Sequence, residues 1–279
     1  MSRPLAAGVA GPASRYLLLS IVTIGALAPG YLMVTGSLKT QDQFLDSPWG
    51  LPSSLSIAAY SRAAHEGLPL WFVNTMVVTL ASVVGVVVLA ALAAWGFAHW
   101  AFRGRETLLG VVVSLMVVPP VVLLIPLFQL GAQLDLISTF RLVVVTYIGL
   151  MLPFSIYLLA NFFSSIPSAV LEAAEIDGAS SWMAFRHIVI PLSGAPLATL
   201  AVVNIMWAWN ELLLALVFLQ DNDKKTLMVG LAGFKGRFSL DVPTVMAGLT
   251  LVTVPLVIAY ILAQRYFIAG LTAGGSKGE

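Results

Sequence analysis

Residues 171–191 read LEAAEIDGASSWMAFRHIVIP, a polar stretch inside an otherwise strongly apolar chain. Pro167 suits the first turn of a helix, where its missing N–H costs nothing, and good helix formers follow it through Ile176. Gly178 then supplies a residue able to take a positive φ just past a helix end. The stretch therefore predicts a short helix that ends at a glycine elbow.

A second short helix is expected after the elbow. Ser180 or Ser181 can cap it, and it must stop near Pro191 because the residue before a proline avoids helical backbone. Helices this short are marginal alone in water, so both need a partner surface. Ala173 and Ala174 leave one side thin enough for close approach. The alternative is an ordinary surface loop with a solvated acidic face, made of Glu172, Glu175 and Asp177.

The composition predicts a membrane protein. Of the 279 residues, 59% are hydrophobic and 10% are charged, and the mean hydropathy is +0.96, whereas soluble domains carry about 25% charged residues. The absence of cysteine excludes disulfides and thiolate metal sites. No basic patch points to nucleic acid. The histidines show no metal-ligand spacing: His65, His99 and His187.

Six segments are apolar enough to cross a membrane, which takes about 20 residues each. They are 15–35, 71–98, 107–130, 141–163, 194–220 and 244–268. The first run is longer than the apolar core of a signal peptide, so we expect it to be retained. The predicted fold is an all-α polytopic membrane protein with an N-terminal tail (1–14), a transmembrane domain (15–268) and a C-terminal tail (269–279).

The polar stretch resembles the EAA loop of ABC-importer membrane subunits. That loop reads Glu-Ala-Ala, three residues, Gly, nine residues, Ile, one residue, Leu, Pro; here Ile190 replaces the Leu. The resemblance implies that residues 164–193, Asp177 included, form the loop where a separate ATPase docks. The matched positions are Glu172, Ala173, Ala174, Gly178, Ile188 and Pro191.

Three further stretches resemble the maltose-type carbohydrate branch of this superfamily. Residues 207–216 (WAWNELLLAL) resemble its Trp-Asn-Glu segment, and residues 264–278 (QRYFIAGLTAGGSKG) resemble the tail of its smaller permease subunit. With residues 118–126 (VPPVVLLIP), the likeness covers about residues 70–278. It implies a type I ABC importer permease, without a catalytic residue, for a carbohydrate or related polyol.

The implied partners are a homologous second permease, two ATPase subunits, an external solute-binding protein and the lipid bilayer. This chain would hold no cofactor, because ATP and Mg would bind to the ATPase subunits. Its tail runs Gly, four residues, Gly, Ser, Lys, whereas a P-loop needs Lys before Ser or Thr. We expect a flexible finger instead. The resemblance implies that this finger contacts the ATPase dimer through Gly270, Thr272, Gly274 and Gly275.

Charge alone does not orient the chain. With both termini inside, Lys and Arg divide seven against seven between the two sides, so the positive-inside rule gives no decision by count. Arg103 and Arg105, in the shortest loop, favour that loop inside. The resemblance implies that the chain lies in the cytoplasmic membrane and that the loop at 164–193 faces the cytoplasm, where the ATPase is. Both termini are then cytoplasmic, and 36–70 and 221–243 lie outside.

Glu211 is the one acid deep in an apolar segment, and it follows Asn210. An unpaired carboxylate in lipid costs several kcal/mol, so Glu211 needs either a wet translocation path or a hydrogen-bonding partner on another helix. Asn210 is a candidate for the path as well. Asn74 and Gln129, at the ends of the second and third spans, either line the path or serve as packing or interfacial groups. Trp207 and Trp209 are candidates for stacking on a sugar ring. Anchoring at the membrane interface is expected for the other tryptophans considered, which are Trp71, Trp95, Trp100 and Trp182.

Three prolines are expected to bend the third span: Pro119, Pro120 and Pro126. A bend suits a span that lines a changing pathway, but it also serves simple shape-fitting within a bundle. Two other classes of function stay open from the residues alone. One is a stand-alone secondary transporter, and the other is a membrane scaffold that transports nothing.

Overall fold

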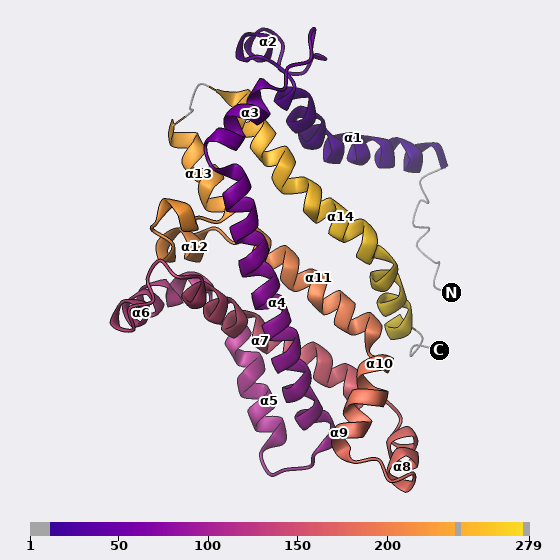
Figure 1. The fold of residues 1–279 in the computed structure, drawn as a ribbon. Coiled ribbons are helices and arrows are strands. Elements are labelled where there is room, and N and C mark those ends of the chain that lie inside the picture. The colour runs from indigo at the N-terminus through magenta and orange to yellow at the C-terminus, as the bar shows by residue number, and fades with distance from the viewer. Residues whose placement is uncertain (1–11, 238–240, 276–279) are drawn as a thin grey trace, which may run out of the picture. The chain divides into compact units, whose positions relative to one another are not determined.

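The computed structural model describes residues 12–237 and 241–275. Within these ranges the chain folds into helices and connecting turns, and it forms no β-strand (Figure 1). The elements, in chain order, are α1 (Pro12–Ser37), α2 (Gln41–Asp46), α3 (Ala58–His65), α4 (Leu68–His99), α5 (Arg105–Ser114), η1 (Leu115–Val117), α6 (Pro120–Gln133), α7 (Phe140–Ser164), α8 (Ser168–Ile176), α9 (Ser181–Ala184), η2 (Phe185–Val189), α10 (Ile190–Leu192), α11 (Gly194–Asn210), α12 (Leu213–Phe218), η3 (Asn222–Lys224), α13 (Leu227–Arg237) and α14 (Val242–Gly275).

The chain divides into two compact units. Unit 1 comprises residues 1–66 and 233–253, and unit 2 comprises residues 67–232 and 254–279. Unit 2 holds the polar 171–191 stretch and the bundle of α4, α7 and α11 on which that stretch is built.

Two apolar clusters form the core of unit 2. The first joins α4, α7, α11 and α12 around Tyr147, Ala208 and Phe218, all of which are buried. The second joins the other ends of α4 and α7 to the 164–193 segment, through Trp95 and Phe185 among others. The polar stretch is therefore attached to the bundle by its own apolar side chains rather than suspended from it.

Three described helices are long and apolar enough to cross a membrane without a break: 14–37, 68–99 and 140–164. These match the predicted spans at 15–35, 71–98 and 141–163. The sixth predicted span, 244–268, lies within α14 (Val242–Gly275). The segment Val242–Ile258 of this helix is apolar but shorter than a full span. The predicted segments at 107–130 and 194–220 are both interrupted, so neither is one continuous helix.

The third predicted span is broken rather than bent. The helical run 105–117 meets α6 at 96°, and Pro119 and Pro120 lie at the junction. Pro119 takes an extended backbone and Pro120 occupies the first position of α6, so neither has to donate a helical hydrogen bond. Pro126 lies inside α6. The expectation of a proline bend is thus right in place but too small in size.

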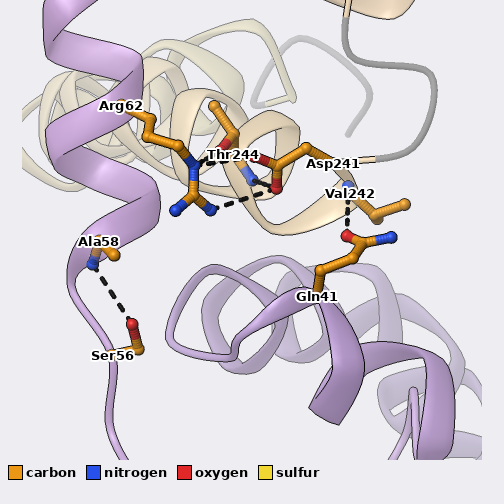
Figure 2. A network of polar contacts seen from close by, with 7 residues as sticks. All are labelled: Gln41, Ser56, Ala58, Arg62, Asp241, Val242 and Thr244. Atoms are coloured by element: carbon orange, nitrogen blue, oxygen red, sulfur yellow. Dashed lines mark hydrogen bonds and ion pairs between the residues drawn. The ribbon is translucent and has the colours of Figure 1, made fainter.

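Within unit 1, polar side chains contact the start of α14. The Arg62 guanidinium pairs with the Asp241 carboxylate at 2.8 Å and donates to the Thr244 hydroxyl at 3.0 Å (Figure 2). Asp241 in turn accepts from the Thr244 backbone N–H, and the Gln41 side chain accepts from the Val242 N–H. The orphan amides at this helix start are met by side chains from residues far apart in sequence.

Two expectations need correction, one about the tryptophans and one about the C-terminal tail. Trp71 and Trp95 are buried, so in this chain they pack inside rather than anchor at a membrane surface, whereas Trp100 and Trp182 are exposed. The tail is not a flexible finger up to Gly275, because α14 continues to that residue. Extending an existing helix needs no new nucleus, which offsets the poor helix propensity of glycine. Residues 276–279 and the N-terminal tail to residue 11 lie outside the described residues.

Candidate coupling loop and polar sites

The first half of the polar stretch forms the expected helix and elbow. After α8, Gly178 takes φ +81°, its N–H donates to the Glu175 carbonyl at 3.0 Å, and the Ala179 N–H donates to the Ala174 carbonyl at 2.9 Å. This pair of bonds is a Schellman motif, which satisfies carbonyls that a helix end leaves without partners. A Cβ at Gly178 would meet nothing within 4 Å, so glycine is required there by backbone conformation and not by space.

The second half forms the expected second helix. Ser180, and not Ser181, is the cap, because its hydroxyl accepts from the Met183 N–H. The helical run then passes through Pro191 and ends at Leu192. A π-turn at Phe185–Val189 widens the helix just before the proline. Ile190, which precedes the proline, keeps a helical backbone, and the helix ends near Pro191 as the sequence predicts.

Apolar side chains anchor this loop to the bundle. Phe185 and Val189 are buried in the second cluster, and Leu171 and Ile190 pack against it. The Phe185 ring lies 5.8 Å from the Trp95 ring of α4 and 5.3 Å from the Trp182 ring. Displacement of the loop must therefore disturb α4 and α7, which gives it a direct mechanical connection to the long helices.

The outer side of the same loop is uncovered and carries apolar groups among three exposed acids, which are Glu172, Glu175 and Asp177. Ile176 is 87% exposed and Trp182 is 57% exposed, and Ala173 is exposed as well. Ala174 is the inward member of the alanine pair. Exposed apolar groups on an amphipathic element mark a site for another surface. Two short helices with such a face can receive a protein partner.

The ends of unit 2 differ in character. The turn that carries Arg103 lies at the same end of the unit as α8 and α9 (Figure 1). At the start of α4, the Asn74 amide donates to the Asp223 and Lys225 carbonyls at 2.8 and 2.9 Å. The Thr75 hydroxyl accepts from the Leu227 N–H at 2.7 Å. Asn74 is thus a buried group that holds the 222–227 segment, which is the packing role that the sequence left open.

Glu211 lies at a break between α11 and α12. Its backbone is extended, and one carboxylate oxygen accepts from the Leu214 N–H at 2.8 Å. The other oxygen accepts from the Ala215 N–H at 3.1 Å and from the Tyr147 hydroxyl at 2.6 Å. The carboxylate therefore caps α12 and joins it to α7. The bond to Tyr147 is the hydrogen-bonding partner on another helix that one interpretation of the sequence expected, but neither interpretation included a helix cap.

The neighbours of Glu211 divide into buried and exposed groups. Trp209 is 3% exposed and meets Phe72 edge-on, so it offers no open ring face. Trp207 is half-buried, with its ring 5.2 Å from that of Tyr147. Asn210 is exposed, and its amide donates to the Met206 carbonyl at 2.7 Å. Gln129 is exposed on α6, away from this group in the chain.

Sequence reasoning missed two polar partners inside the bundle. Tyr147 is completely buried and supplies the hydroxyl that reaches Glu211. Asn204 donates to the Ser155 hydroxyl at 3.2 Å, and both residues are buried. One signal was present for the first of these, since a tyrosine in the middle of a span needs a partner for its hydroxyl.

Comparison with known proteins identifies the family. The family described as "Binding-protein-dependent transport system inner membrane component" matches residues 86–272. The chain belongs to this family. It is a membrane-spanning permease subunit of an ABC importer, and the expectation drawn from residues 171–191 is confirmed at that level.

Two relatives align along almost the whole chain. The melibiose/raffinose/stachyose import permease protein MelC of Bacillus subtilis is 31% identical, with 94% of this chain and 95% of the relative covered. The trehalose transport system permease protein SugB of Mycobacterium tuberculosis is 32% identical, with 95% and 98% covered. These matches give no support to a stand-alone secondary transporter.

A solved structure shares the fold of this permease. A chain of a bacterial ABC transporter involved in the import of the acidic polysaccharide alginate superposes with a TM-score of 0.78 at 24% identity. The match covers 91% of this chain and 95% of the other. The expected ABC importer permease fold is therefore confirmed.

Proposed function

We propose that this permease imports a carbohydrate or a related polyol and that residues 164–193 are its docking loop for a cytoplasmic ATPase. The observation that carries the docking proposal is the two-sided build of the loop. Its inner face is buried against α4 and α7 through Phe185 and Val189, while its outer face exposes Ile176 and Trp182. Such a loop can both bind a partner and transmit the partner's movement to the spans.

The proposed orientation has the docking loop in the cytoplasm. The turn between α4 and α5, whose sequence contains Arg103, lies at the end of unit 2 that carries α8 and α9 (Figure 1), and short basic turns favour the cytoplasmic side. Both termini are then cytoplasmic. Energy enters through ATP and Mg bound to two ATPase subunits, because this chain is proposed to have no nucleotide site of its own.

The proposed assembly contains four kinds of partner. A homologous second permease completes the passage, two ATPase subunits dock on the two loops, an external solute-binding protein delivers the substrate, and the lipid bilayer surrounds the spans. The tail residues Gly270, Thr272, Gly274 and Gly275 are proposed to reach the ATPase dimer. No residue of this chain is given a covalent role, so the driving force is the difference in stability between the states of the ATPase dimer.

The substrate class is supported by the relatives, since MelC and SugB are both named for import of sugars. Trp207 and Asn210 remain the proposed contacts on the path, because Trp209 is buried in this conformation. A partly open indole beside an exposed amide suits a hydroxyl-rich ring. The test is uptake of labelled oligosaccharides by the assembled complex. Uptake of an amino acid or a metal instead of any sugar would contradict this assignment.

The docking surface is tested by placing a charge on it. Ile176→Glu changes an exposed residue, so the chain should fold and reach the membrane, but its recovery of ATPase on purification should fall at least about tenfold, or about 1.4 kcal/mol. Leu51→Glu is the matched control, because Leu51 is 77% exposed on the loop between α2 and α3. Equal ATPase recovery with both variants would remove the docking role from this face.

A further inference from the structure

The segment predicted to be the fifth span is interrupted in its apolar interior. Helix α11 ends at Asn210, Glu211 is extended with φ −69° and ψ 123°, and α12 begins at Leu213. A helix break leaves backbone N–H and C=O groups without intrahelical partners. At membrane depth such backbone is tolerated only where protein buries it or where it lines a water-filled cavity.

One side of the break is satisfied by protein. The Glu211 carboxylate accepts from two amides of α12 and from the Tyr147 hydroxyl, so three donors converge on it. A carboxylate at a helix start also interacts favourably with the helix dipole. This arrangement explains how an acid lies within an apolar segment with no basic partner among the residues that the structure describes.

The Tyr147 hydroxyl is held in a fixed position. Tyr147 has no exposed surface, lies in the first apolar cluster on α7, and meets the Trp207 ring edge-on at an interplanar angle of 82°. The hydroxyl therefore keeps a fixed position relative to α7. Through it, the bond to Glu211 fixes the start of α12 relative to α7.

The other side of the break faces outward from the chain. Asn210 is exposed, and its neighbours Met206 and Leu213 are each 43% exposed. A polar side chain within a span faces either the bundle interior or a water-filled cavity, and not lipid. Since Asn210 is not buried in its own chain, its surroundings must be supplied by the passage of the assembled transporter.

We propose that Glu211 is a positioning residue that holds this segment broken at 211–212, so that the Asn210 end of α11 forms a fixed polar edge on a water-filled passage. Tyr147 sets the geometry of that edge by fixing the carboxylate. The proposal deepens the transport function proposed above, on which it rests, but it assigns Glu211 no contact with the substrate. It differs from a docking or specificity role because its consequence is water access at residue 210.

The test measures water access at residue 210 in the assembled complex. The chain has no cysteine of its own, so Asn210→Cys introduces a single thiol into this subunit. Its reaction with a small charged methanethiosulfonate is followed in membranes, with this subunit resolved from its partners by size. The thiol should react, whereas Val145→Cys, at an exposed valine of α7, should not. Absence of reaction at 210 both with and without ATP would overturn the proposal.

Second substitutions in the Asn210→Cys chain then test the roles of the Glu211 carboxylate and the Tyr147 hydroxyl. Adding Glu211→Leu should slow the reaction at 210 about tenfold, which is the scale of losing a side-chain cap. Adding Glu211→Gln, which keeps the shape and an acceptor oxygen, should slow it less than about threefold. Equal rates for the Leu, Gln and parent carboxylate backgrounds would overturn the positioning role.

Tyr147→Phe guards against a folding failure of the Leu variant. It removes one hydroxyl and keeps the buried ring, so the complex should assemble in normal amounts while the reaction at 210 slows about three- to fivefold. Tyr157→Phe is the matched control on the same helix, because Tyr157 is 44% exposed. An unchanged rate of thiol reaction at residue 210 with Tyr147→Phe would overturn the role of the Tyr147 hydroxyl in positioning Glu211. Because labelling needs no substrate, an error in the sugar assignment leaves this test intact.

Discussion

Gly178 offers the sharpest test of the coupling loop because its cost can be worked from the backbone. The residue takes φ +81° and a Cβ there would meet nothing within 4 Å, so substitution adds only local strain. Left-handed backbone costs an L-residue about 1–2 kcal/mol, which lowers the population of the elbow about 5- to 30-fold. Asn tolerates this conformation better than Ala, and a β-branched residue tolerates it worst.

The assay is ATPase co-purification together with substrate uptake at matched membrane levels. Both should fall in the order Gly, Asn, Ala, Val at position 178. Gly104 provides a matched series, since it has φ +84°, a Cβ there would also meet nothing within 4 Å, and it lies outside the docking loop. Substitutions there carry similar strain but should leave ATPase recovery near that of the parent chain. The reasoning fails if Gly178→Val recovers full ATPase, or if the Gly104 series falls as steeply.

Four further substitutions have expected outcomes. Asn74→Leu leaves two carbonyls unpaired, so we expect a loss of about 1–3 kcal/mol and faster proteolytic cleavage at 222–226; a cleavage rate equal to that of the parent would contradict it. Phe185→Ala should lower thermal stability by about 3–5 kcal/mol, whereas Trp182→Ala, at an exposed residue, should lower ATPase recovery with little change in melting temperature. Arg62→Met should cost at most about 1 kcal/mol because its pair with Asp241 is partly exposed, and a larger loss in denaturant unfolding would show that the pair is more than a surface contact.

The sequence predicted the features that depend on local backbone chemistry. The elbow at Gly178 follows from a glycine after a run of helix formers. A serine cap follows from the hydroxyls before the next helix, although the sequence left it open between Ser180 and Ser181 and the structure has Ser180. The positions of three continuous spans follow from length and hydropathy alone. Each of these properties is encoded within a few neighbouring residues.

The features that the sequence did not predict depend on distant partners. Glu211 interrupts an apolar run only because Tyr147, 64 residues away, and the amides of α12 satisfy its carboxylate. The same limit applies to Asn74, whose partners are carbonyls about 150 residues further along the chain. Hydropathy treats such segments as uniform, so it joined α11 to α12 and missed the break. Pro191 shows a different limit. The residue before a proline usually avoids helical backbone, but here Ile190 follows the π-turn and stays helical.

The continuous helix around the π-turn has a consequence for the coupling proposed above. Because the helix continues to Leu192, residues 181–192 form a single lever roughly 18 Å long. The lever meets α11 at 74°, at a pivot where the Ser193 hydroxyl donates to the Val189 carbonyl. A swing of about 5° displaces the far tip by about 1.5 Å. With the docking role proposed above, a push from the ATPase on this lever would become rotation at the base of α11, and its stroke would depend on the angle between the two helices.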